Sequence, residues 1–212
     1  MRAVRAVALA VFFLSFSSGA FAGELGRAIA GRAEALVGLP SVAAVARDVP
    51  DDCTGLVRLV YGKSGIDLRD LPAQPGDNGV TSLFRAAHVA HAFHRRAPRA
   101  GDIVFFHETY DRNRDGKRND GLTHVGVVDS VKADGSVTFV HRMRSGIARS
   151  RLSLRHPRRR AANDVLRRGT STSRAYLAGE LVSGFASPEL LLLHRTSARA
   201  RRATPLPRHR PG

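Results

Sequence analysis

The hydrophobic periodicity of this chain changes once, from helical in the first half to strand-like after residue 101, and this limits the folds it can adopt. Apolar residues recur at helical spacing in three segments: 24–37, 53–65 and 81–96. Short apolar or alternating runs then follow at 103–106, 123–131, 136–141 and 148–154. Asp134-Gly135 is a turn signal that joins the middle two runs into a hairpin. Helices followed by an antiparallel meander predict an α+β fold.

The first 22 residues are typical of a cleavable signal peptide. Arginines at positions 2 and 5 precede an apolar run over 6–16, and Ala20-Phe21-Ala22 is a small-x-small cleavage site. The apolar run is short for a bilayer span, which disfavours the alternative of an uncleaved membrane anchor. We therefore expect cleavage near Ala22 and an exported protein, located in the periplasm or outside the cell.

The formal net charge of +16 is unevenly distributed. Residues 141–174 carry eleven arginines against one acid, and residues 194–212 carry six arginines and no acid. Such segments suggest an anionic envelope polymer as a partner, although a merely solvated arginine-rich surface is the alternative. No nucleic acid is expected, because aromatic residues are not interleaved with the basic ones. We predict a folded domain over 23–193 and a disordered basic tail over 194–212.

Cys53 is the one cysteine, and an unpaired thiol in an exported protein needs a reason to be kept. It stands at the predicted start of the helix over 53–65, where Asp52 or Asp51 can act as the cap. A helix N-terminus lowers the pKa of a thiol and offers N–H groups to an oxyanion. Cys53 is therefore a candidate nucleophile, with Asp52 and Thr54 as candidate substrate or oxyanion contacts. The alternative is a small buried hydrophobic residue.

Two histidines lie on strands that the predicted hairpin places side by side. His124 begins one strand and His141 ends the other, so His124 can take the cysteine proton while His141 holds its tautomer. His107, which follows an earlier strand, is a rival for the third position. Taken singly, each histidine could be an ordinary surface residue, but together with a cysteine at a helix start they favour nucleophilic catalysis.

These motifs resemble the NlpC-type cell-wall peptidases and are similar to the related CHAP amidases. The resemblance rests on four stretches: Asp52-Cys53-Thr54-Gly55-Leu56-Val57, 98–106, His124-Val125-Gly126-Val127-Val128 and Phe139-Val140-His141. It covers roughly residues 24–155. Thr54 stands where the family usually has serine, and the aromatic and double-glycine stretch before the nucleophile is missing from residues 39–50.

The resemblance implies a papain-like α+β fold, with N-terminal helices packed on an antiparallel sheet, that cleaves amide bonds of peptidoglycan stem peptides or another peptide substrate. By position, Cys53 matches the nucleophile that forms a thioacyl intermediate, His124 the base and His141 the third member. Acyl transfer or deamidation would use the same chemistry. A different class of function is a catalytically inactive papain-like module that binds cell-wall or other anionic envelope polymers.

An insertion before His124 has the spacing of a calcium loop. Asp111, Asn113 and Asp115 occupy its first, third and fifth positions and Gly116 its turn, while Asp120 or Glu108 could replace the glutamate that should stand at position twelve. Four basic residues in the loop oppose cation binding, and an Asx-rich surface turn is the alternative. We expect no required cofactor and consider a structural calcium at Asp111, Asn113, Asp115 and Asp120.

Overall fold

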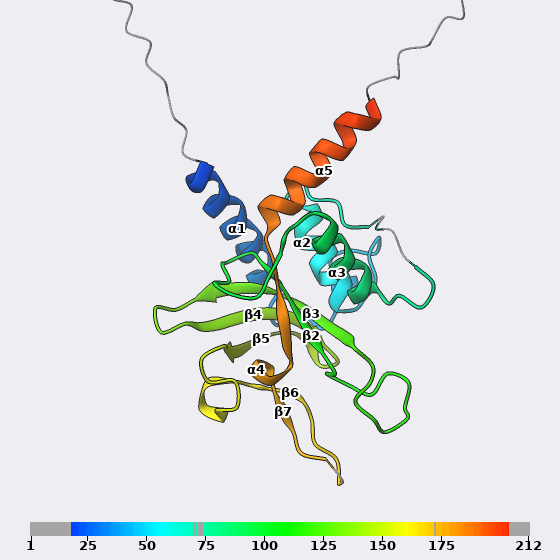
Figure 1. The fold of residues 1–212 in the computed structure, drawn as a ribbon, viewed down its shortest axis with the longest axis vertical. Coiled ribbons are helices and arrows are strands. Elements are labelled where there is room, and N and C mark those ends of the chain that lie inside the picture. The colour runs from blue at the N-terminus through cyan, green and yellow to red at the C-terminus, as the bar shows by residue number, and fades with distance from the viewer. Residues whose placement is uncertain (1–17, 70, 72–73, 172, 204–212) are drawn as a thin grey trace, which may run out of the picture.

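The computed structural model describes residues 18–69, 71, 74–171 and 173–203, and Figure 1 shows how their helices and strands are arranged. Three helices come first: α1 (Ser18–Glu34), α2 (Cys53–Gly62) and α3 (Gly79–Val89). A short 3-10 turn, Val42–Ala44, lies between the first two. The sheet follows them along the chain, so the predicted order of helices and then strands is confirmed.

Six antiparallel strands form the main sheet in the order β1-β8-β2-β3-β4-β5. Their bounds are β1 Phe93–His94, β2 Ile103–His107, β3 Leu122–Val131, β4 Ser136–Met143, β5 Gly146–Ser153 and β8 Val182–Ala186. The predicted hairpin pairs β3 with β4, for example Val127 with Val140 and Val128 with Phe139. A second, two-stranded sheet joins β6 (Val165–Arg167) to β7 (Tyr176–Leu177).

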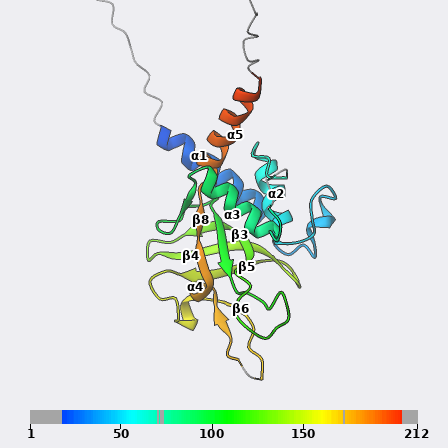
Figure 2. The same cartoon turned by 45° about the vertical axis from the view of Figure 1, so that its right-hand side comes forward.

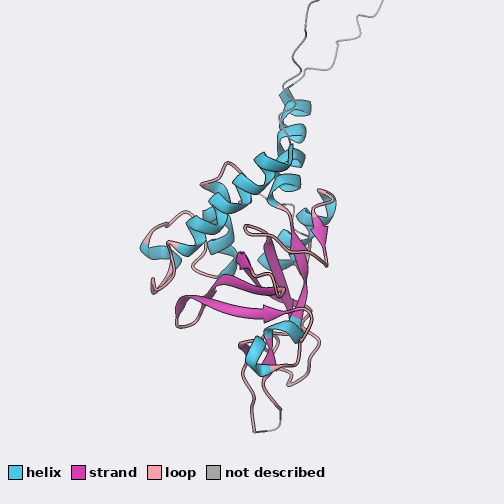
Figure 3. Ribbon diagram, turned by 90° about the vertical axis from the view of Figure 1, so that its left-hand side faces the viewer, coloured by secondary structure: helices cyan, strands magenta, loops and turns pink. Residues whose placement is uncertain are grey.

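The two faces of the main sheet are covered by different elements, as Figures 2 and 3 show. On one face, apolar residues of α1, α2 and α3 pack with strand residues such as Ile103 and Val127. On the other face, Phe106 and Phe139 pack with residues of the short helix α4 (Ala178–Leu181). Burial of both faces stabilises the sheet mainly through the hydrophobic effect. The structure is the predicted α+β fold.

The chain between 81 and 96 departs from the predicted helix. α3 ends at Val89, because the N–H of Ala92 turns back to the carbonyl of Ala87 and His91 takes a positive φ of 52°. Phe93 and His94 then form the edge strand β1 against β8. The prediction of helix for these last residues is wrong, because pairing with a strand about ninety residues later overrides the local periodicity.

The C-terminal part differs most from expectation. β8 inserts between β1 and β2, and the helix α5 (Pro188–Ala203) follows it and contacts α1. The prediction of disorder from 194 therefore does not hold for 194–203, while 204–212 lie outside the described residues. The segment 155–170 contains a 3-10 turn at Arg160–Ala162 and the strand β6.

The predicted signal peptide lies mostly outside the described residues, which begin at Ser18. Helix α1 starts there, six residues before the predicted helix and inside the predicted leader. None of the described helices combines the length and the apolar character needed to cross a membrane.

Candidate active site

Asp52 fixes the first turn of α2. Its Oδ1 accepts hydrogen bonds from the N–H of Thr54 at 2.8 Å, the N–H of Gly55 at 2.9 Å and the hydroxyl of Thr54 at 2.7 Å. A carboxylate at this position satisfies N–H groups that have no partner within the helix. The helix therefore begins at Cys53, as the sequence predicts, and the thiol lies in its first turn.

This capping gives Asp52 and Thr54 a different role from the predicted one. The N–H groups of Thr54 and Gly55 are already bonded to Asp52, so they are not free to hold a substrate oxygen. The N–H of Cys53 donates no hydrogen bond to another residue in the described part of the chain. Asp52 and Thr54 thus position the helix, and the N–H of Cys53 is the donor left for an oxyanion.

Gly55 allows the chain before the nucleophile to lie against the first turn of α2. A Cβ at position 55 would stand 1.6 Å from the carbonyl oxygen of Pro50, a distance that no side chain tolerates. Any other residue would force the segment leading to Asp52 away from the helix. The glycine in the motif is therefore required by a close backbone approach.

The pKa of the Cys53 thiol is raised to about 11. Burial is the larger cause and the negative charge of Asp52 adds to it, while the N–H groups of Val125, Cys53 and Thr54 lower the pKa by less. Removing a thiolate from water costs more free energy than the N–H groups at the helix start contribute to stabilising it. The predicted lowering of the thiol pKa is therefore wrong for the ligand-free protein, in which the thiol is protonated at neutral pH.

His124 and His141 form a hydrogen-bonded pair. Nε2 of His124 lies 2.8 Å from Nδ1 of His141, and the two rings meet edge to face with centroids 5.1 Å apart. The rings also lie against Phe106 and Phe139 of the second core, the apolar cluster on the α4 side of the sheet. Burial lowers the pKa of His124 to about 4 and that of His141 well below its usual value, so both rings are neutral at pH 7.

Ser150 on β5 extends this pair, and sequence reasoning missed it. Its Oγ lies 3.0 Å from Nε2 of His141 and is buried. If Nδ1 of His124 is to accept a thiol proton, Nε2 of His124 must carry the hydrogen and donate it to His141, which in turn donates to Ser150. The sequence signal for this contact is that Ser150 is a small polar residue at an inward-facing position of the alternating run 148–154.

His107 does not take the third position. Its Nδ1 lies 3.2 Å from Oγ of Ser183 on β8, whereas the ring bonded to His124 is that of His141. Gly126, two residues after His124 on β3, lets this strand approach β4 closely beside His141. A Cβ there would lie 2.8 Å from the carbonyl oxygen of Val140 and 3.2 Å from Cβ of His141.

The thiol and the imidazoles approach β3 from different sides. Cys53 packs against the core shared with the helices, and the N–H of Val125 is among the groups that lower its pKa. His124 pairs in register with Phe106 and shares its face of the sheet. No hydrogen bond joins the thiol to His124 within the described residues. Proton transfer between them therefore requires the two groups to meet at the start of β3.

A cleft of about 1000 Å³ opens beside the histidine pair. His124 and His141 form part of its wall, together with Tyr110 and Asp111 at the start of the insertion and with residues 142–145 at the β4–β5 turn. Residues 165–168 and 170, in and after β6, line it as well. The size is that of a small-molecule or peptide site. The electrostatics of the cleft is set by four arginines: Arg142, Arg144, Arg167 and Arg168.

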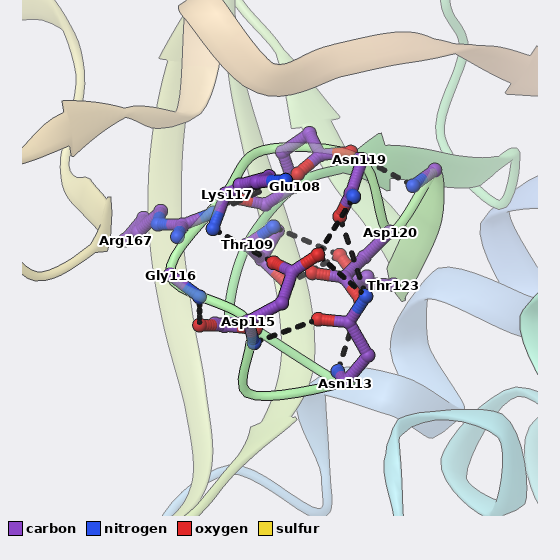
Figure 4. Close-up of polar contacts among 12 residues, drawn as sticks. Glu108, Thr109, Asn113, Asp115, Gly116, Lys117, Asn119, Asp120, Thr123 and Arg167 are labelled. Carbon is purple, nitrogen blue, oxygen red and sulfur yellow. Dashed lines mark hydrogen bonds and ion pairs between the residues drawn. The ribbon is translucent and has the colours of Figure 1, made fainter.

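The insertion over 111–121 engages the predicted calcium ligands in hydrogen bonds, and Asn113 bonds to both Asp115 and Asp120. Figure 4 shows that its polar groups bond mainly to the loop itself. Asp111 accepts from the N–H of Gly116, Asp115 from that of Lys117, and Asp120 from that of Asn113. One oxygen each of Asp111 and Asp120 is buried without a partner. Even so, no group of three His, Cys, Asp or Glu residues suited to a metal occurs in the described residues.

The loop keeps this conformation through its own hydrogen bonds, and a structural calcium stays an untested prediction. Buried bonds tie its ends to the site instead. The N–H of Thr109 donates to Oγ1 of Thr123 at 2.8 Å, and Oε1 of Glu108 accepts from the N–H of Gly121 at 2.8 Å. These contacts hold the two ends of the insertion together immediately before His124.

Comparison with known protein families matches residues 45–142 to the CHAP domain. A search of curated proteins found no match. The matched range contains Cys53, His124 and His141, and CHAP domains are typically amidases or peptidases associated with peptidoglycan. The match supports the predicted resemblance to the CHAP amidases but does not show the NlpC-type assignment. Residues 45–142 of this chain, with the helix of Cys53 and the strands of the two histidines, form a CHAP domain of papain-like fold.

Proposed function

We propose that this chain is an exported cysteine hydrolase that cleaves amide bonds of peptidoglycan stem peptides. The observation that supports it most is the partly buried hydrogen-bonded pair His124–His141, located in a CHAP domain whose single cysteine starts a capped helix. A neutral, oriented imidazole beside a cleft is what general-base activation of a thiol requires.

The pKa directions favour general-base catalysis over a preformed ion pair. The thiol and His124 are both neutral before substrate binds, since the pKa of the thiol is about 11 and that of His124 about 4. In the proposed first step, Nδ1 of His124 takes the thiol proton while the sulfur attacks the amide carbonyl. The N–H of Cys53 then stabilises the oxyanion.

The second half of the reaction uses the same groups in reverse. The imidazolium of His124 gives its proton to the leaving amine as the carbon–nitrogen bond breaks, which leaves a thioester on Cys53. Water, deprotonated by His124, hydrolyses the thioester and restores the thiol. His141 accepts from Nε2 of His124 throughout and stabilises the transient imidazolium, so it is a positioning residue.

Product analysis of digested peptidoglycan tests the proposal. Full-length protein, Cys53→Ala and His124→Ala are each incubated with purified sacculi and with soluble muropeptides, and products are identified by mass spectrometry. We expect new amine and carboxyl termini with the wild type only. Equal product yields from wild type and Cys53→Ala would instead favour a binding module without turnover. Circular dichroism shows whether each variant is folded.

Export is proposed from the leader and is tested separately. Cell fractionation followed by N-terminal sequencing should find the protein outside the cytoplasm with Gly23 as its first residue. A cytoplasmic protein that retains Met1 would contradict the proposal. Binding of the arginine-rich segments to an anionic envelope polymer is a further proposal, and co-sedimentation with purified envelope polymer at rising salt checks it.

A further inference from the structure

The wall of the cleft beyond the catalytic pair is basic. Arg142 donates to both carboxylate oxygens of Asp51, at 3.2 and 3.1 Å, and Arg167 donates to the carbonyl oxygen of Glu108 at 2.9 Å. The side chains of both arginines are largely buried. These two guanidinium groups are therefore held in place by the protein and are partly neutralised by it.

Arg144 and Arg168 differ from this first pair. Both are exposed and line the cleft, and neither makes a hydrogen bond or ion pair with any described residue. Asp111 is the one acidic residue among those that line the cleft, and it bonds to the N–H of Gly116. Two uncompensated positive charges thus face a space bordered by the apolar side chains Val165 and Leu166.

Most of the basic wall lies outside the segment that matches the CHAP domain. Arg144, Arg167 and Arg168 all lie beyond residue 142, where the match to the CHAP domain ends. The wall is also tied to the insertion before His124, because Arg118 and Arg174 each stack on the ring of Tyr176 at 4.1 Å. Such cation–π contacts hold the β6–β7 hairpin against the insertion.

We infer that Arg144 and Arg168 form a subsite for a free carboxylate of the substrate, so that the enzyme selects acidic peptides over their amidated forms. This inference rests on the proposed function for its link to turnover. A guanidinium group binds a carboxylate through two parallel hydrogen bonds, and the apolar residues Val165 and Leu166 that line the same cleft suit the carbon chain that carries it. A cleft of about 1000 Å³ accommodates a peptide of a few residues.

The experiment compares two synthetic stem peptides that differ only in free carboxylates against carboxamides. Their affinities are measured by calorimetry with full-length Cys53→Ala, and their kcat/KM with the otherwise wild-type chain. The test variant is Arg144→Gln/Arg168→Gln. The control is Arg96→Gln/Arg155→Gln, which removes the same charge from an exposed residue just after β1 and from a residue beside the β3–β4 turn, which joins the strands at the end away from the histidines.

We expect the free acid to bind more tightly, and the test variant to lose about tenfold in affinity and kcat/KM for the free acid alone, mostly through KM. The control variant should match the parent. Equal affinity for acid and amide, an equal loss for both peptides, or the same loss in the control would each overturn the inference.

Two further outcomes separate the possibilities. If the Cys53→Ala protein prefers the free acid while the wild type hydrolyses neither peptide, the subsite stands and the proposed hydrolase function fails. The alternative outcome is that neither peptide binds, whereas a polyphosphate chain binds to the parent and not to Arg144→Gln/Arg168→Gln. In that case the arginines bind phosphate groups of a polymer and the carboxylate assignment is wrong.

Discussion

Replacing Asp52 with asparagine separates its two effects on the nucleophile. Asparagine keeps an oxygen that can cap α2 but removes the negative charge, which is the second cause of the raised Cys53 pKa. The pKa stands at about 11 against an ordinary 9.0. This difference corresponds to roughly a hundredfold less thiolate at a given pH below 9.

Burial is the larger of the two causes that raise the pKa and the charge of Asp52 is the second, while hydrogen bonds to the sulfur offset part of both. Asp52→Asn should therefore lower the thiol pKa and raise the thiolate fraction, and with it the rate of alkylation, by on the order of tenfold at pH 8. The free energy of unfolding should fall by about 1 kcal/mol, because hydrogen bonds from N–H groups to a charged oxygen become bonds to a neutral one.

The assay is the rate of iodoacetamide modification of full-length protein between pH 6 and 11, followed by intact mass. Asp51→Asn is the matched control. It also removes one carboxylate charge, but from the neighbouring side chain, which is paired with Arg142. An unchanged or higher thiol pKa in Asp52→Asn would refute the reasoning. A wild-type thiol that titrates below about pH 8 would also refute it, since helix-start stabilisation would then outweigh burial.

Three other predictions concern the histidine pair. Gly126→Ala should cost about 1–3 kcal/mol in urea unfolding and reduce kcat, because its Cβ meets the backbone of β4 beside His141; an unchanged stability would show that the strand shifts freely. Ser150→Ala should lower kcat about tenfold with little change in KM, and full activity would remove Ser150 from the relay. The folded-state pKa values of His124 and His141 are lowered, so the unfolded chain binds more protons than the folded one as the solution is acidified. The free energy of unfolding should therefore fall as the pH is lowered from 6.5 to about 4. A free energy that stays constant over this range in chemical denaturation would contradict the burial of the two rings.

Local sequence patterns were sufficient for most of the elements that carry the site. Asp52 followed by an apolar helical stripe indicates both the cap and the start of α2, and the turn at Asp134-Gly135 indicates the pairing of β3 with β4. These features depend on residues close together in the chain, where capping and turn chemistry act. The placement of His141 beside His124 follows from that hairpin.

Features that depend on distant contacts could not be predicted in the same way. β8 lies between β1 and β2 although about ninety residues separate it from β1 and about eighty from β2, and nothing in residues 182–186 identifies its neighbours. The direction of the Cys53 pKa was missed for a related reason. A helix start lowers the pKa of an exposed thiol, but the burial that reverses this effect comes from packing against the sheet.

The residues of the site that sequence reasoning missed are those whose function depends on burial. Ser150 is one of two small polar residues in the run 148–154, and its contact with His141 appears only when β5 pairs with β4. The predicted calcium ligands show the converse. Their spacing is suggestive, but their oxygens bond to nearby N–H groups of the same loop.

The distance from Sγ of residue 53 to Nδ1 of residue 124 is the quantity on which the mechanism depends. A crystal structure of the full chain, with the thiol carrying a peptide analogue as a covalent adduct, measures it directly. The mechanism predicts the two atoms within about 4 Å, with Nε2 of the same ring still bonded to His141. An imidazole that stays turned toward the second core, too far for a proton to pass even through one water molecule, would contradict it.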